Sequence, residues 1–373
     1  EQLDNRSIFG GQLSNQQHHT LLGLPLSVSL GADFRYDDID EVGLFSTRER
    51  IRLGAIRNDK VQESSLGLYW ENSLALTDKV KAVAAVRYDY FRFDVDDLAG
   101  ININGIDLSG NSGKADDDKL SFKGGLIYSI NSNWELYGSV GQGFHSNDAR
   151  GTVVEINPAD GSAINTVEPL VASVGYELGM RAFFIDKLNV SLAFWRLTLD
   201  SELLFVGDAG NTEASRASER EGIELTAYYR LNDAWTLDIE YAYADANFTT
   251  TAPECDYIPG AIGDVIQTGV SFDNKQHWFG SLRLRYFGDR PLEESGAIRS
   301  DSSTVVNLRA GYQIDQWTFK ADVLNLLDSD DHDIDYYYAS RLASEVSIGG
   351  GVEDIHFHVL EPRTVRFTAG YVF

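Results

Sequence analysis

Alternation of apolar and polar residues, repeated in segment after segment, is the feature that most constrains this chain. The clearest segment places Trp235, Leu237, Ile239, Tyr241 and Tyr243 between Thr236, Asp238 and Glu240. Successive side chains of a β-strand point to opposite faces, so a period of two predicts a strand with one apolar and one polar face. About fifteen such segments follow one another across the 373 residues. We therefore expect an all-β chain of antiparallel strands.

The connections between these segments are of two kinds. The tight turns are expected at residues 77–79, 131–133, 186–187, 232–233, 273–275 and 315–316. They alternate with longer polar loops, expected at about residues 38–60, 94–118 and 145–169. Short turns at one end and long loops at the other are typical of transmembrane β-barrels, whereas sandwiches vary their loops at both ends. The pattern predicts an antiparallel transmembrane β-barrel.

Aromatic residues gather at both ends of the expected strands. Trp134, Trp235, Trp278 and Trp317 each follow a tight turn, whereas Tyr241 and Tyr243 stand at the far end of their strand. Membrane barrels carry such aromatic girdles at the two interfaces between lipid and water. We expect these six residues to belong to the girdles.

The opposite face of the expected strands is charged. It carries Glu240, Arg283, Arg285, Arg309, Lys320 and Asp322. Both signs are interspersed, so neighbours can pair across adjacent strands. We expect these side chains to face a water-filled lumen.

The chain finishes on a further alternating segment. Val365, Phe367, Tyr371 and Phe373 share one face of the stretch from residue 363 to residue 373. In a membrane barrel the last strand pairs with the first and its apolar face meets lipid. We expect these four residues to mark the strand that closes the barrel.

Composition excludes several functions. The formal net charge of −26 would repel the phosphates of a nucleic acid. No apolar run approaches the roughly 20 residues of a membrane helix. The single cysteine, Cys255, cannot form a disulfide within the chain, and the sequence assigns it no role. Since no nucleophile elbow, phosphate loop or paired-cysteine metal motif is present, we expect neither an enzyme nor a bound cofactor.

Several stretches resemble one family. The segments at residues 328–341, 349–358 and 361–365, with VLNLLD at 323–328 before them, resemble the carboxyl-terminal end of TonB-dependent outer-membrane receptors. GFHSNDARG at 143–151 and LRYFGDRPL at 284–292 resemble two further stretches of the same family. The resemblance runs across the whole chain in one register.

The resemblance implies more than this sequence holds. Such receptors have an amino-terminal TonB box, a plug domain and 22 barrel strands, whereas residues 1–373 supply about fifteen strands and no plug. An odd number of strands cannot close an antiparallel bacterial barrel. The chain also begins at Glu1 and shows no signal peptide. We therefore interpret residues 1–373 as the carboxyl-terminal part of a receptor barrel that is mature, truncated or a fragment.

The resemblance also implies a function. It predicts a receptor in the outer membrane of a Gram-negative bacterium, which imports a scarce ligand such as an iron–siderophore complex with energy from TonB. The expected partners are membrane lipid and lipopolysaccharide, the receptor's own plug domain, TonB acting through that plug, and a small metal chelate or nutrient. The sequence does not identify the ligand.

Other interpretations remain open. A passive porin-like channel or an outer-membrane enzyme of about fourteen or sixteen strands would show similar strands. A soluble β-rich adhesin is a third candidate, which the aromatic bands disfavour. His356 and His358, two residues apart, would share one face of a strand and could bind a transition metal, although we prefer the explanation that they order the last outer loop.

Overall fold

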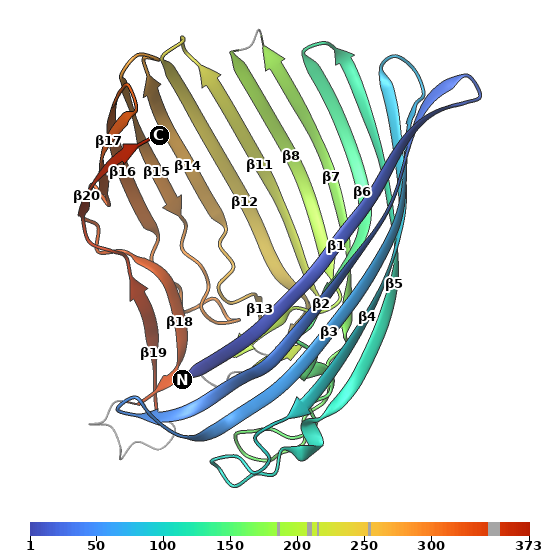
Figure 1. The fold of residues 1–373 in the computed structure, drawn as a ribbon, viewed down its shortest axis with the longest axis vertical. Coiled ribbons are helices and arrows are strands. Elements are labelled where there is room, and N and C mark those ends of the chain that lie inside the picture. The colour runs from blue at the N-terminus through green and yellow to red at the C-terminus, as the bar shows by residue number, and fades with distance from the viewer. Residues whose placement is uncertain (185–186, 207–210, 215, 253–254, 342–350) are drawn as a thin grey trace. The chain divides into compact units, whose positions relative to one another are not determined.

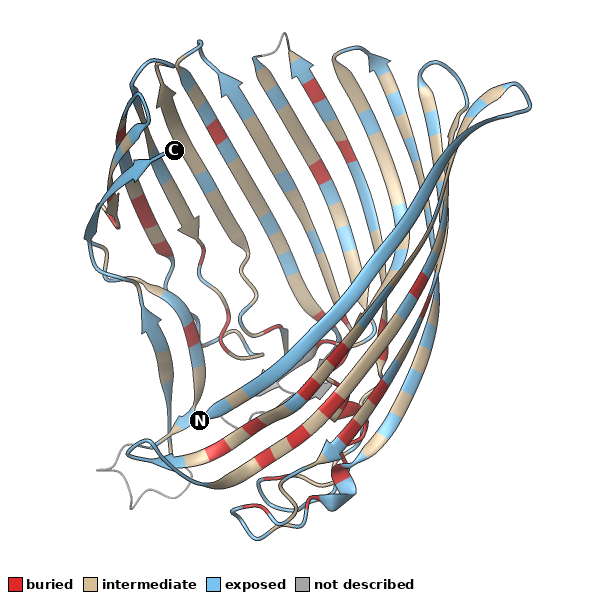
Figure 2. Cartoon of the chain, viewed as in Figure 1, coloured by how far each residue is buried: buried red, intermediate tan, exposed pale blue. Residues whose placement is uncertain are grey.

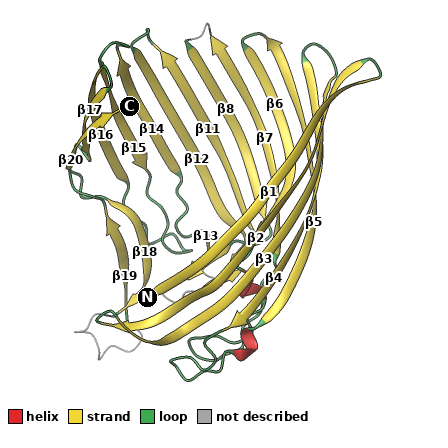
Figure 3. Cartoon of the chain, viewed as in Figure 1, coloured by secondary structure: helices red, strands yellow, loops and turns green. Residues whose placement is uncertain are grey.

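The regular secondary structure of the described residues is almost entirely β-strand (Figures 1 and 3). The computed structural model describes residues 1–184, 187–206, 211–214, 216–252, 255–341 and 351–373, so Asp186 of one expected tight turn lies outside the described residues. Among the described residues, no helix is long and apolar enough to cross a membrane.

The strands and the two short 3₁₀ helices have the following bounds: β1 (Gln2–Leu21), β2 (Leu24–Arg48), β3 (Ile51–Ala75), β4 (Val80–Asp97), η1 (Ser109–Asn111), β5 (Gly113–Asn131), β6 (Trp134–Ser146), η2 (Ala149–Thr152), β7 (Leu170–Phe184), β8 (Leu188–Leu199), β9 (Leu203–Val206), β10 (Asn211–Ala214), β11 (Ser218–Arg230), β12 (Trp235–Ala252), β13 (Cys255–Tyr257), β14 (Asp264–Asp273), β15 (Trp278–Phe287), β16 (Ser303–Ile314), β17 (Trp317–Leu324), β18 (His332–Ser340), β19 (Val352–Val359) and β20 (Thr364–Tyr371).

One large antiparallel sheet confirms the predicted fold class. Across the described residues its order is β1-β2-β3-β4-β5-β6-β7-β8-β11-β12-β14-β15-β16-β17-β20, a path of fifteen strands to which β13 adds at β12. Strands that follow each other along this path are neighbours in the sheet, as the predicted succession of hairpins requires. Two small hairpins, β9–β10 and β18–β19, stand outside it.

The contacts between residues divide the chain into two units. The first comprises Glu1–Ile127, Ser139–Gly175 and Thr198–Ala217, and the second comprises Tyr128–Gly138, Tyr176–Leu197 and Ser218–Phe373. The first therefore contains β1 to β4 with the long loops after β4 and β6. The second contains β11 to β20.

The first unit corrects the expected loop at residues 38–60. β2 continues to Arg48 and β3 begins at Ile51, so that only Glu49 and Arg50, both with positive φ, connect the two strands. The ladder between β2 and β3 shifts register three times along this stretch, the first shift lying between Ile39 and Val42. Each such irregularity breaks the period of two, which is why alternation alone did not reveal these strand ends.

The expected loop at residues 94–118 is also shorter than predicted. β4 runs to Asp97 and β5 starts at Gly113, so the acidic run at residues 116–118 lies in a strand. Lys119 offsets part of this charge, since its ammonium group lies 3.6 Å from an Asp117 oxygen. Acidic residues in a strand are tolerated where such partners are available.

A small apolar core holds a loop against the first unit's strands. Ile39 of β2, Val61 of β3 and Phe93 of β4 are buried together with Ala149 and Val153 of the loop at residues 147–169. Figure 2 shows buried positions in red along β2, β3 and β4. Burial of these side chains from water stabilises the contact between loop and sheet. The core thus fixes this loop on one face of β2, β3 and β4.

Four tryptophans begin strands in the second unit, each directly after a tight turn. Trp134, Trp235, Trp278 and Trp317 are the first residues of β6, β12, β15 and β17. Each packs against an aromatic ring of another strand, with ring centroids 5.3 Å apart for Trp134 and Phe184, 4.7 Å for Trp235 and Phe272, 4.7 Å for Trp278 and Tyr312, and 4.9 Å for Trp317 and Tyr371. Aromatic pairs of this kind stabilise neighbouring strands.

The pair at the last strand can be tested. Trp317 contacts both Tyr371 and Phe319, so Trp317→Ala should lower the free energy of unfolding by about 1–3 kcal/mol, as expected for two lost aromatic contacts. Trp317→Phe, which keeps an aromatic ring, should lose less than half of that. Urea unfolding of the protein in lipid vesicles measures both. Equal losses for the two variants would show that the ring contacts contribute nothing specific.

Candidate functional site

The polar face of the second unit carries ion pairs that reach across strands. Asp238 of β12 and Arg283 of β15 are joined by an ion pair, although β14 runs between them. Gly269 of β14 is the register partner of both residues, and a Cβ at Gly269 would overlap the Arg283 side chain. Because Gly269 has no side chain, it leaves a gap on β14, here called the glycine slot, through which the Arg283 guanidinium reaches the buried Asp238 carboxylate.

A second such group lies on β16, β17 and β20. Asp322 is buried and accepts a hydrogen bond from Arg309 at 2.6 Å, while Arg366 approaches its other oxygen at 3.5 Å. These three residues are register partners on adjacent strands. The expected pairing of wall charges is therefore present at Arg309 and Asp322.

The remaining predicted wall charges have different surroundings. Glu240 accepts a hydrogen bond from the Tyr228 hydroxyl at 2.8 Å, and the Arg285 guanidinium lies 4.8 Å from the centre of the Phe287 ring. Lys320 is half-buried beside Gly311, its register partner on β16. Sequence reasoning predicted charge pairing in general, but it did not predict these aromatic partners.

The glycine slot gives a direct test. Gly269→Ala should displace the Arg283 side chain and leave the Asp238 carboxylate without its cation. Because Asp238 is only 7% exposed, this loss should lower the free energy of unfolding by about 1–3 kcal/mol. Gly124→Ala is the matched control, because no atom lies within 4 Å of an added Cβ there. Denaturant titration compares the two variants. A loss at Gly124 equal to that at Gly269 would contradict the role of the slot.

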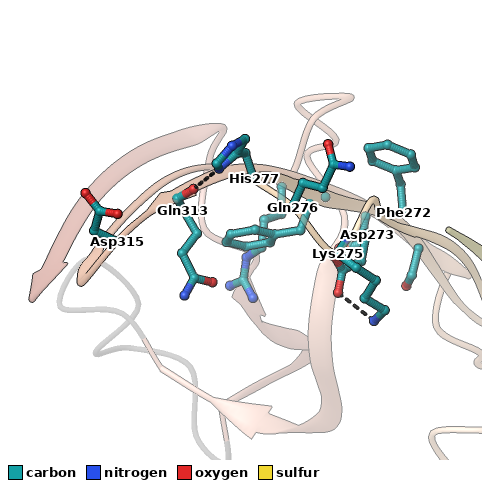
Figure 4. A pocket seen from close by; sticks show the side chains of 12 residues that line it. Phe272, Asp273, Lys275, Gln276, His277, Gln313 and Asp315 are labelled. Carbon is teal, nitrogen blue, oxygen red and sulfur yellow. Dashed lines mark hydrogen bonds and ion pairs between the residues drawn. The ribbon is translucent and has the colours of Figure 1, made fainter. Parts of the chain in front are cut away.

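A polar pocket of about 700 Å³ lies beside two tight turns of the second unit (Figure 4). In its wall, Lys275 donates to Asp273 at 2.8 Å, and His277 Nδ1 lies 2.9 Å from the carbonyl oxygen of Gln313. Asn274 accepts hydrogen bonds from the backbone N–H groups of Gln276, His277 and Trp278. The pocket wall is thus shaped by its own hydrogen bonds and presents polar groups to whatever enters.

The predicted histidine pair lies on the β18–β19 hairpin. The His356 ring stacks on Tyr338 at 4.0 Å between centroids, and His358 Nδ1 lies 2.8 Å from an Asp333 oxygen. Nearby, His332 stacks on Phe357. Among the described residues, no group of three or more histidine, cysteine or acidic side chains is arranged to hold a metal ion. Metal binding by His356 and His358 alone therefore stays a prediction.

The last strand runs beside β17. β20 spans Thr364–Tyr371, so Phe373 lies just beyond it. The four predicted residues are all exposed: Val365 by 53%, Phe367 by 81%, Tyr371 by 44%, and Phe373 fully. This exposure is compatible with a strand that meets lipid on its apolar face and pairs with a further strand. Closure of the barrel by this strand stays a prediction.

Several arginines of the first unit pair with an aspartate two residues away in sequence. These pairs are Asp4–Arg6, Arg35–Asp37, Arg57–Asp59, Arg87–Asp89 and Asp148–Arg150. The first four lie on strands, where residues two apart share a face and their side chains meet. Arg150 belongs to η2, and Asp148 directly precedes that helix. Burial opposes ionisation of Asp148, but hydrogen bonds from Arg150 outweigh it and hold the pKa of that carboxyl below its usual range.

Two buried asparagines join the long loops of the first unit. Asn111 donates to the carbonyl of Ile156 at 2.9 Å and accepts from the N–H groups of Glu155 and Ile156. Asn102 donates to the carbonyls of Pro158 and Ile56, which ties the loops to β3. A side-chain amide can satisfy buried backbone groups of both kinds. The loop after β4 and the loop after β6 therefore form one hydrogen-bonded assembly.

Removal of one of these amides tests that assembly. Asn111→Ala deletes three hydrogen bonds and leaves partly buried backbone groups of residues 155 and 156 without these partners, so hydrogen exchange at residues 150–160 should accelerate by about tenfold or more. Asn104→Ala, which removes a single hydrogen bond of 3.2 Å to the carbonyl of Pro158, should change exchange much less. Mass spectrometry of exchanged peptides measures both, and unchanged exchange in Asn111→Ala would refute the bracing role.

These features escaped sequence reasoning for a common reason. The slot at Gly269 and the amides of Asn102 and Asn111 depend on which strands and loops become neighbours, and a single sequence does not give that register. The arginine–aspartate pairs do leave a signal, namely opposite charges two residues apart within a strand.

Comparisons with known proteins concern the fold of the chain. A family model described as TonB dependent receptor-like, beta-barrel matches residues 2–326. The pesticin receptor of Yersinia enterocolitica is 22% identical over 298 residues, which covers 76% of this chain and 42% of that receptor. This chain thus spans less than half the length of the curated relatives that it matches.

Solved structures agree in fold. The ferric yersiniabactin uptake receptor of Yersinia pestis aligns with a TM-score of 0.73 at 16% identity, covering 99% of this chain and 54% of that one. The siderophore receptor PiuA of Acinetobacter baumannii aligns with a TM-score of 0.74 at 12% identity, covering 99% and 56%. At such low identity the likeness concerns the fold alone.

Proposed function

Because the chain belongs to the TonB-dependent receptor-like β-barrel family, we propose that it forms part of the barrel wall of an outer-membrane receptor that imports a scarce ligand in a Gram-negative bacterium. Such a receptor binds its ligand at the cell surface, and energy from TonB, acting through a plug domain, drives the import. In this proposal one face of the sheet meets lipid and lipopolysaccharide while the other lines the ligand's path.

The observation that carries the proposal is the exposure of large apolar side chains on one face of each unit. In the first unit, Leu30, Leu68 and Trp70 are each about half exposed. In the second, Trp235, Leu237 and Ile239 are each 40% exposed, whereas Asp238 between them is buried. A water-soluble sandwich would bury the apolar face, but lipid solvates it without penalty.

The ordered loops of the first unit support ligand capture. Binding residues are commonly carried by loops that a rigid scaffold positions. The bracing by Asn102 and Asn111 holds two such loops on β3 and reduces the conformational entropy that binding would otherwise cost. We assign ligand recognition to these loops.

The proposed ligand class is an iron–siderophore complex. The names of the ferric yersiniabactin and PiuA receptors, which share the fold, support this choice. The relatives are named as receptors, which favours transport over catalysis. A passive porin-like channel is the second candidate, because a charged lumen wall would serve diffusion as well.

Uptake in cells separates the two candidates. We expect the whole protein to bind its radiolabelled iron chelate at the surface of intact cells with or without TonB, and to import it only when TonB is present. The measurement compares cell-associated and internalised iron in otherwise identical strains with and without TonB, and a strain lacking this protein sets the background. Import that continues at the same rate without TonB would favour the passive channel.

A further inference from the structure

A cavity of about 290 Å³ opens on the charged face of the first unit, and one carboxylate in its wall stands apart from the others. Glu63 of β3 lies opposite Asp37 of β2 and Phe93 of β4 in the sheet register. The cavity is lined by Glu63, Asp37, Arg35 and Phe91, with the hydroxyl-bearing residues Ser65 and Ser146. Its size suits a small polar head group rather than a whole siderophore.

The charges around Glu63 are already matched with one another. Asp37 and Asp148 are the nearby carboxylates, and Arg6 and Arg35 are the nearby guanidinium groups. Arg35 holds Asp37 through two hydrogen bonds of 2.8 Å. Asp148 is bound by Arg150, and Arg6 is bound by Asp4. Each of these neighbours therefore has a close partner of opposite charge.

Glu63 differs from them. Within the part of the chain that the structure describes, its carboxylate makes no hydrogen bond and no ion pair, although its position between β2 and β4 shields it partly from bulk water. A shielded carboxylate without a partner loses hydration energy that a cation would restore. The cavity therefore carries one negative charge that nothing in the described wall compensates.

The rest of the wall fits a nitrogen cation better than a metal ion. No group of three or more metal-ligating side chains occurs among the described residues, so a divalent ion would find too few ligands here. Phe91 offers an aromatic ring, which is itself packed against Phe144 at 5.7 Å between centroids. Carboxylate, aromatic ring and hydroxyl groups together are the surroundings that an organic ammonium or guanidinium group prefers.

We propose that this cavity is a binding site for the ammonium or guanidinium group of a small organic cation, with Glu63 as its counter-ion and Phe91 as its aromatic wall. The site does not depend on TonB-driven import, because it is built from residues of β2, β3 and β4 and from Ser146 at the end of β6. It would select amine-bearing solutes over neutral or anionic ones that reach the same face.

Binding of simple amines to the whole protein in detergent tests the proposal. Benzylamine is the probe, because it joins an ammonium group to a ring, and benzyl alcohol and benzoate are its neutral and anionic counterparts. Calorimetric titration or saturation-transfer NMR should show benzylamine binding at least tenfold more tightly than either counterpart. Equal binding of benzylamine and benzyl alcohol, or no binding of benzylamine up to millimolar concentration, would overturn the proposal.

Two variants identify the site. Glu63→Gln keeps the shape of the side chain and removes its charge, so it should weaken benzylamine binding at least tenfold. Glu71→Gln is the matched control, since Glu71 lies eight residues along the same strand and on the same face, and it should leave binding unchanged.

Phe91→Leu should weaken binding severalfold through loss of the aromatic wall. Unchanged affinity in Glu63→Gln would refute the assignment, and the comparison of probes on the unaltered protein remains decisive if that variant fails to fold.

Discussion

The fold depends on one constraint, the need of every strand to satisfy its backbone N–H and C=O groups through its neighbours. In lipid no water can replace those partners, so a spanning sheet must carry its hydrogen bonds from strand to strand without interruption. The fifteen-strand path from β1 to β20 meets this demand in the simplest order, with hairpin following hairpin. Because the backbone alone holds the strands together, the side chains on the two faces can differ. One face carries exposed apolar side chains, and the other carries paired charges.

Paired charges make the polar face possible. A single arginine or aspartate on a shielded wall would be costly, whereas a hydrogen-bonded pair offsets much of that cost. In the second unit the pairs form across strands, through the slot at Gly269 or by direct register as at Arg309 and Asp322. In the first unit many form along the strand, between residues two apart, and Arg87 of β4 also reaches across β3 to Asp33 of β2. Both arrangements use the pleat of the sheet, which brings side chains of one face within reach.

Sequence patterns predicted the type and order of the strands but not their full lengths. Trp235 and Trp317 mark strand starts correctly because a tight turn and an aromatic ring coincide there. β2 and β3 extend well beyond the predicted ends, because register shifts near Ile39 and Leu44 erase the alternation that identifies a strand. The sequence predicts that one face of the strands carries charged residues, because the period of two and the residue types are enough for that. It does not predict that Glu63 lacks a partner, because this depends on the nearby arginines being paired with aspartates.

The joined loops of the first unit carry a consequence for variation among relatives. Asn102 and Asn111 belong to one loop, yet their hydrogen bonds end on backbone groups of residues 155, 156 and 158 in the other. An insertion in either loop would move one half of this contact away from the other. The two loops should therefore be exchanged, lengthened or lost together when specificity diverges among relatives. A chimaera that receives both loops from one relative should recognise that relative's ligand, whereas a chimaera that receives only one loop should not.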